Sequence, residues 1–240
     1  MPVLTGAGFK VYVFDLLGYG LSERPRNPEV DMSVSGQVPV LEGLMTLRGL
    51  KEAHVVSHEI GGDVAQRFCV FSPSRVRSLT LIDVVSFDAL PSRRTREQMQ
   101  EGLELFVGKP DGEHREHFRE WLLSTVSNKR HLSESALDTY FDFVSCPVGQ
   151  ASLFQHQVGR CDHRQAEEVA DRLSELGEMP VQIVRSEDDQ WQVVAWAHKP
   201  HDAIPNSELH VLNECGHFAM EDKPTEVGQL LVSFRATHCR

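Results

Sequence analysis

Residues 54–68 read HVVSHEIGGDVAQRF, and this stretch decides the fold of the chain. A short β-branched run reaches a turn of small residues, and a helical pattern follows at once. Glu59 therefore lies where a strand gives way to a helix, and Gly61 and Gly62 leave room for the two elements to pass closely. This arrangement is typical of the nucleophile elbow, G-x-S-x-G, whose central residue faces the substrate. Here that residue is a glutamate, and Ser57 stands in place of the first glycine.

Strands and helices alternate around this stretch. β-branched and aromatic runs predict strands at Lys10 to Asp15, Ala53 to Ser57, Val76 to Val85, Val181 to Arg185 and Glu208 to Leu212. Apolar residues at helical spacing predict helices at 33–50, 60–71 and 225–236. The alternation predicts an α/β fold in which a mostly parallel sheet carries helices on both faces.

The middle of the chain follows a different pattern. Charged helical segments succeed one another at 94–106, 114–126, 133–144 and 165–176, and Ser133 is a candidate N-cap. We interpret this region as a helical cap inserted into the sheet domain. The predicted division is 1–85 for the first part of the core, 86–179 for the cap and 180–240 for the second part of the core.

Charge and cysteine content narrow the class of protein. The formal net charge of -11 excludes surfaces for nucleic acid or anionic membrane, because both need basic patches, and leaves a small-molecule substrate or a protein partner. The five cysteines lack CxxC spacing, which predicts free thiols in a reducing compartment. Without a membrane-length apolar run or a signal peptide, we expect a soluble, cytoplasmic protein.

The histidines do not predict a metal site. His114 with His117, and His198 with His201, have i,i+3 spacing, but no carboxylate–histidine ligand pattern accompanies them. We assign no metal and no cofactor.

Two loops after late strands complete the candidate catalytic centre. Asp189 follows one strand and His217 the next, so both fall with Glu59 at the carboxyl edge of the sheet, where ligands of such folds bind. We expect His217 to act as a base and Asp189 to fix its tautomer, although Asp188 and Glu187 compete for the second role. For Glu59 the alternatives are a nucleophile, a general base and a turn residue without chemistry.

The chain resembles the α/β-hydrolase superfamily, and within it the haloalkane and haloacetate dehalogenase and epoxide hydrolase branch. The motifs that carry the resemblance are GFKVYVFDLLGYGLSERP, SHEIGG, PVQIVRSEDDQW, CGHFAMEDKP and, for the cap, HLSESALDTYFDFVSCP. It implies a carboxylate at the elbow that attacks carbon to form an ester, which water activated by histidine then hydrolyses. The backbone amide of Ile60 is the implied oxyanion donor.

The resemblance also assigns cap residues to the substrate pocket, with departures. Trp121, Tyr140 and His156 are the pocket candidates, although packing alone explains Trp121 and Tyr140 equally well. Tyr140 matches one of two tyrosines that polarise epoxides, whereas His156 stands at the other. Ile60 occupies the place of a halide-binding tryptophan, and Asp63 replaces the first of two arginines that bind haloacetate. The elbow glutamate is one methylene longer than the family's aspartate.

The N-terminus departs most from the family. The chain opens just before the family's fourth strand, so its first strands and a His-Gly oxyanion loop are missing. An incomplete chain, completion of the sheet by a partner chain and a degenerate pseudoenzyme are competing explanations. Because an open sheet edge invites pairing, we expect a homo-oligomer or a partner chain.

These observations predict an α/β-hydrolase-fold enzyme with an inserted helical cap. The expected reaction is hydrolysis of a small organic substrate through, or assisted by, the Glu59 carboxylate. The alternatives are a lyase, isomerase or cyclase that uses Glu59 and His217 as acid and base, and an inactive pseudohydrolase that binds a ligand or partner.

Overall fold

The computed structural model describes all residues except 26, 28, 85–92, 161, 193–197 and 239–240. Its sheet has four parallel strands in the order β1-β2-β3-β4. The strands are β1 (Ala53–His58), β2 (Val76–Ile82), β3 (Val181–Ser186) and β4 (Glu208–Leu212). All their carboxyl ends therefore meet at one edge, as the sequence predicted for these segments.

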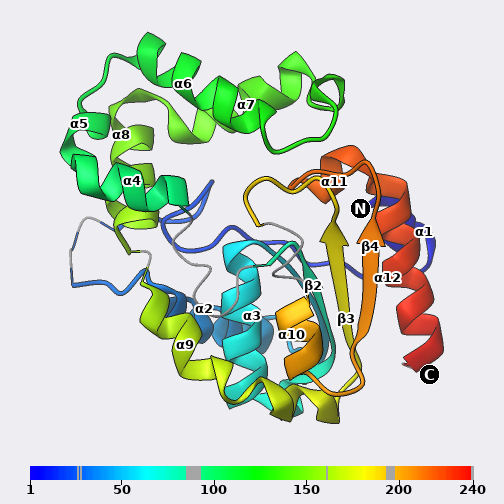
Figure 1. Ribbon diagram of the computed structural model, residues 1–240. Coiled ribbons are helices and arrows are strands. Elements are labelled where there is room, and N and C mark those ends of the chain that lie inside the picture. The colour runs from blue at the N-terminus through cyan, green and yellow to red at the C-terminus, as the bar shows by residue number, and fades with distance from the viewer. Residues whose placement is uncertain (26, 28, 85–92, 161, 193–197, 239–240) are drawn as a thin grey trace.

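Helices cover both faces of the sheet (Figure 1). On one side lie α2 (Val34–Leu47) and α3 (Ile60–Phe71), and on the other α12 (Pro224–His238) packs with the short α1 (Pro2–Gly6). Each predicted helix of the core is thus confirmed within a few residues. The structure also contains several short elements: η1 (Pro73–Arg75), η3 (Lys129–His131), η5 (Val158–Arg160), α10 (His198–Ala203) and α11 (Ala219–Asp222).

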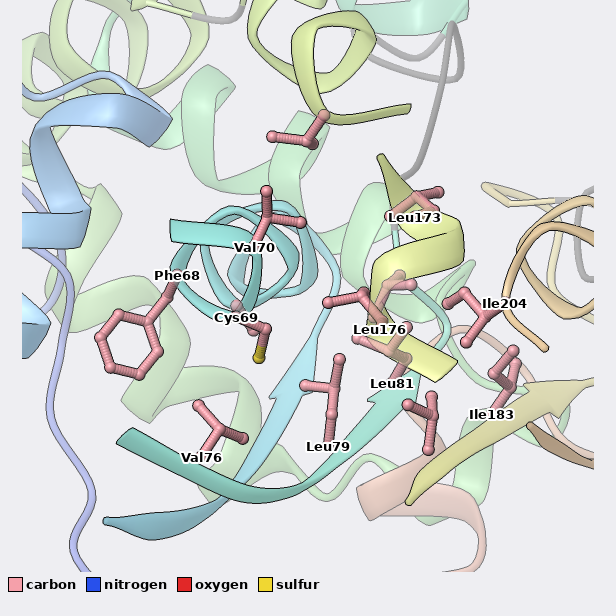
Figure 2. Packing of buried hydrophobic residues seen from close by; sticks show 14 of the residues in the cluster. Phe68, Cys69, Val70, Val76, Leu79, Leu81, Leu173, Leu176, Ile183 and Ile204 are labelled. Atoms are coloured by element: carbon pink, nitrogen blue, oxygen red, sulfur yellow. The ribbon is translucent and has the colours of Figure 1, made fainter. Parts of the chain in front are cut away.

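The main hydrophobic core lies between α3 and the sheet. Figure 2 shows Phe68 and Cys69 of α3 with Leu79 and Leu81 of β2 and Ile183 of β3. All five side chains are at most 1% exposed. β2 and β3 are central strands whose residues are buried, except Arg77. Their buried residues include polar side chains, among them Thr80 and Gln182, which form a hydrogen bond with each other at 3.3 Å.

The predicted strand from Lys10 to Asp15 is wrong. These residues have no strand assignment, and among the described residues β1 pairs with β2 alone, which leaves the other edge of β1 unpaired. A strand needs backbone hydrogen bonds to a neighbour, and residues 10–15 form no such ladder with the unpaired edge of β1. Apolar side chains are exposed on both segments, with Val13 74% and Val56 48% exposed.

A separate helical layer lies above the carboxyl edge of the sheet (Figure 1). It comprises α4 (Arg93–Glu101), α5 (Leu103–Val107), α6 (Asp111–Leu123), α7 (Glu134–Val144), α8 (Cys146–Ala151) and η4 (Ser152–Gln157), and has an apolar core of its own. The helix predicted at 94–106 is divided at Gly102, whose φ of 99° interrupts it. Ser133 caps α7 as predicted, by accepting a hydrogen bond from the Ala136 amide at 3.2 Å.

The end of the predicted cap packs with the core instead. Val169 lies in α9 (His163–Ala170), and Leu173 and Leu176 lie in η6 (Leu173–Glu178). All three side chains belong to the apolar cluster around α3, and Figure 2 labels Leu173 and Leu176 within it. We therefore propose that the cap ends before α9 rather than at residue 179. No described helix combines the length and apolarity needed to cross a membrane.

Candidate active site

The elbow predicted from the sequence is present. Glu59 lies between β1 and α3 with φ 49° and ψ -124°, a conformation that is strained for a residue with a side chain. Helix and sheet pass so closely here that a Cβ at Gly62 would lie 2.2 Å from Cβ of Val84. The small residue at this position is therefore a steric requirement of the elbow.

The carboxylate of Glu59 is held by the start of its own helix. Its Oε2 accepts a hydrogen bond from the amide of Ile60, the backbone donor that the sequence singled out. Loss of water around the carboxylate raises the pKa of Glu59, although His217 and the Ile60 amide oppose this shift. The amide fixes one oxygen in the field of the helix N-terminus.

Asp189 and His217 form the buried pair that was predicted. Nδ1 of His217 donates to Oδ2 of Asp189 at 2.9 Å, and both side chains have no exposed area. Oδ1 of Asp189 accepts from the amides of Trp191 and Gln192, each at 2.8 Å, which fixes the carboxylate. The rival acids at 187 and 188 are exposed.

Nε2 of His217 is the second nitrogen of the ring, opposite the one that binds Asp189. Within the described part of the chain, buried Nε2 has no hydrogen-bond partner. Burial alone would lower the pKa of His217, but the hydrogen bond and charge of Asp189, with Glu59 and Asp83, outweigh it and leave the pKa raised. Nδ1–H therefore points at Asp189, and Nε2 is available to accept a proton.

His58 is a part of the site that the sequence reasoning missed. Its Nε2–H donates to the carbonyl oxygen of His217 at 2.8 Å, and the two ring centroids lie 4.8 Å apart. Burial, together with the charge of His217, lowers the pKa of His58 to about 3, so it is neutral. Its position immediately before the elbow centre was the available signal.

Asp83 is a second residue that was missed. It follows β2 with φ 44°, is fully buried and accepts from both the amide and the hydroxyl of Ser186 at 2.7 Å. Burial, reinforced by Asp189, raises the pKa of Asp83 to about 6. An acid directly after the apolar run of β2, at the same sheet edge as the other candidates, was the signal for it.

Asp63 is buried without a partner. It is 1% exposed, and neither carboxylate oxygen has a hydrogen-bond partner among the described residues. Burial raises its pKa to about 7, against the opposing charge of Arg67. Arg67 instead forms an ion pair with Glu168 at 2.8 Å, so the two helix positions do not form a site for a substrate carboxylate.

Of the three cap residues predicted to line the pocket, the structure brings Trp121 and Tyr140 close to residues around His217. Trp121 stacks on Trp191, which in turn stacks on His217. The Tyr140 hydroxyl donates to Glu221 at 3.1 Å, and its ring centroid lies 5.6 Å from that of Phe218, which follows His217 in the sequence.

His156 is not brought to the centre. It lies against the loop at Gly18, and burial with Arg160 and Arg24 lowers its pKa. Among the described residues, no group of three or more histidine, cysteine or acidic side chains could hold a metal ion.

Comparison with known proteins identifies this arrangement. Over residues 1–224 the chain matches the family described as "alpha/beta hydrolase fold". The chain belongs to the α/β-hydrolase family. It is 25% identical to the 2-hydroxy-6-oxononadienedioate/2-hydroxy-6-oxononatrienedioate hydrolase 2 of Pseudomonas putida, over 96% of this chain and 78% of that protein. The corresponding hydrolase of a Pseudomonas sp is 26% identical, over 98% of this chain and 80% of that protein.

Solved structures agree with this membership. An alpha/beta hydrolase fold protein from Burkholderia ambifaria matches with a TM-score of 0.81 at 25% identity, covering 91% of this chain and 78% of that one. The predicted fold class and the prediction of a hydrolase that acts on small organic substrates are confirmed at the level of the family. The two named relatives are hydrolases of dienedioates and trienedioates, and neither name includes a dehalogenase or an epoxide hydrolase.

Proposed function

We propose that this α/β-hydrolase acts on a small organic substrate through an ester formed on Glu59. The observation that carries the proposal is the different hydrogen bonding of the two carboxylate oxygens of Glu59. The Ile60 amide holds Oε2, whereas Oε1 has no hydrogen bond among the described residues. One oxygen is thus anchored and the other is left to attack, as in the dehalogenase and epoxide hydrolase branch that the sequence resembles.

The first half-reaction forms the ester. Oε1 of Glu59 donates an electron pair to a saturated carbon of the substrate, and the bond from that carbon to the leaving group breaks with its electron pair. Because the elbow holds the carboxylate at a fixed point above the sheet edge, attack is effectively intramolecular once the substrate is bound. The added methylene of glutamate shifts the attacking oxygen, so we expect the pocket to fit the substrate further from the elbow than in an aspartate enzyme.

The second half-reaction uses the buried pair. Nε2 of His217 accepts a proton from water, and the water oxygen attacks the ester carbonyl carbon of Glu59. Negative charge then develops on Oε2, where the Ile60 amide already donates. The tetrahedral intermediate then collapses and releases an alcohol, which takes the proton from His217. Asp189 stabilises the imidazolium until that proton is transferred.

The charge around the base favours an uncharged substrate. Asp189, Glu59 and Asp83 place acidic groups around His217, and Asp63 adds a further acid that interacts with Glu59. Arg67, the residue that could have bound a substrate carboxylate, is already paired with Glu168. A dicarboxylate of the kind named for the relatives would therefore meet repulsion, and we propose a neutral electrophile instead.

The proposal is tested by trapping the ester. In a His217→Ala variant the second half-reaction lacks its base. Styrene oxide should therefore add its whole mass to the peptide that contains Glu59, and 1-bromohexane should add a hexyl group with release of bromide. Bromoacetate, which is anionic, should label more slowly. A Glu59→Gln variant is the control and should not be labelled. Turnover that survives Glu59→Gln without any ester would favour acid–base chemistry and overturn the proposal.

We also propose that the open edge of β1 pairs with a strand of a second copy or of a partner chain. Val56 on β1 is an exposed apolar side chain, as are Val13 and Phe14 of the unpaired segment 10–15, and exposed apolar strand edges are templates for pairing. Hydrogen–deuterium exchange at 11–14 and 53–58 should slow as protein concentration rises. Full protection of 11–14 in a sample shown to be monomeric would contradict the pairing.

A further inference from the structure

An aromatic column runs from the cap to the catalytic histidine. Trp121 of α6 stacks on Trp191 with ring centroids 4.5 Å apart and planes 21° apart. Trp191 stacks in turn on His217, at 5.1 Å and 16°. We propose that Trp191 is a positioning residue that holds the His217 ring against Asp189 and couples its orientation to docking of the cap.

Trp191 touches every partner that such a role requires. Its backbone N–H donates at 2.8 Å to Oδ1 of Asp189, the carboxylate whose other oxygen binds the histidine. Its indole Nε1–H donates at 3.0 Å to Oγ of Ser124, the residue that ends α6. The backbone of Trp191 is therefore fixed by the acid and its indole by the cap, while the ring face lies against the base.

The cap is also attached directly to the loop that carries His217. The amide of Phe218 donates to the carbonyl of Thr125 at 2.8 Å. The carboxylate of Asp222 accepts hydrogen bonds from the amides of Ser127 and Gly216, each at 2.7 Å. It therefore joins the segment that follows α6 to the loop that carries His217. A displacement of α6 would move this loop and the indole column together.

The column also favours one protonation state of the base. An indole face within about 6 Å of a cation attracts it, so stacking stabilises the imidazolium of His217. The other groups that face this ring are Asp189, Glu59 and Asp83, which also favour the cation, and His58, whose charge would oppose it but which is neutral. Loss of the indole should therefore lower the pKa of His217.

The test follows the His217 ring by NMR, with the Cε1–H signal assigned by its absence in His217→Gln. Trp191→Leu should lower the pKa by about half a unit or more and change the ring chemical shift, because the stack is lost. Trp191→Phe keeps an aromatic face and should restore most of both effects. It also keeps the test decisive if the leucine variant does not fold.

Coupling to the cap is tested separately. Trp121→Leu should shift the His217 signal although Trp121 does not touch that ring, whereas Phe141→Leu in the cap core should not. An unchanged pKa and chemical shift in Trp191→Leu would overturn the positioning role, and an unchanged signal in Trp121→Leu would overturn the coupling. The inference rests on the proposed role of His217 as base. The titration does not depend on turnover, so it fails independently of the ester experiment.

Discussion

Replacing Asp63 with asparagine should remove a loss of folding stability that the wild-type protein undergoes as the pH rises from acid to alkaline. The carboxyl has a pKa of about 7 in the folded protein against 3.8 for an ordinary aspartate. The folded state therefore keeps a proton that the unfolded chain releases, and stability is lost between pH of about 4 and about 7. Each pKa unit corresponds to about 1.4 kcal/mol. Between pH 5 and pH 8 this predicts a loss of about 3 kcal/mol that Asp63→Asn removes.

The assay is urea unfolding of both proteins from pH 5 to pH 8. The uncharged amide has its own desolvation cost, but that cost is the same at every pH and cancels from the comparison. Because Glu59 contributes to the raised pKa, the cycle is repeated in a Glu59→Gln background. Asp138→Asn, at an exposed position of α7, is the control and should leave the shape of the curve unchanged. Parallel curves for wild type and Asp63→Asn would refute the reasoning.

Further predictions concern the elbow, the cap junction and the base. Gly62→Ala should lower the free energy of unfolding by about 1–3 kcal/mol, measured by thermal unfolding, because the new Cβ meets Val84. Gly61→Ala has open space around the new Cβ and should be neutral or stabilising. Equal effects of the two substitutions would contradict the packing. Asp222→Ala should cost about 1–3 kcal/mol at neutral pH, because it leaves the buried amide of Gly216 unpaired and removes the hydrogen bond of the exposed Ser127. That cost should shrink in acid, because the pKa of Asp222 is lowered; a pH-independent cost would argue against this. Breakdown of the ester should accelerate as pH rises through the pKa of His217, which Asp189 raises, and single-turnover kinetics without a pH dependence would contradict its assigned role as base.

Most of the core could be predicted from the sequence because its signals are local. The helix 60–71 and the strand Glu208–Leu212 were predicted with the bounds that the structure shows. Asp189 and His217 could be placed together because parallel strands end at one edge of the sheet. In each case periodicity or chain order determines the position without knowledge of distant contacts.

The predicted strand was wrong because distant parts of the chain decide whether it forms. Lys10 to Asp15 has strand composition, but a ladder requires a neighbour, which no residue within the segment can supply. The proposed end of the cap before α9 likewise rests on the packing of Val169 and Leu173 in the cluster around α3, which charge patterning does not reveal.

The stacked Trp191 and the hydrogen bond from His58 to the His217 backbone were missed for the same reason. Both contacts join elements that are far apart in the sequence. Their residue types alone are more often explained by ordinary packing.

The most direct test of the central claim is a single turnover in H₂¹⁸O with enzyme in excess over styrene oxide. If an ester forms on Glu59, the oxygen given to the product comes from the carboxylate, and water attacks the ester carbonyl. The product of the first turnover should then contain ¹⁶O, and the peptide that contains Glu59 should gain one ¹⁸O. An ¹⁸O-labelled product with an unlabelled Glu59 peptide would show direct attack by water and contradict the account.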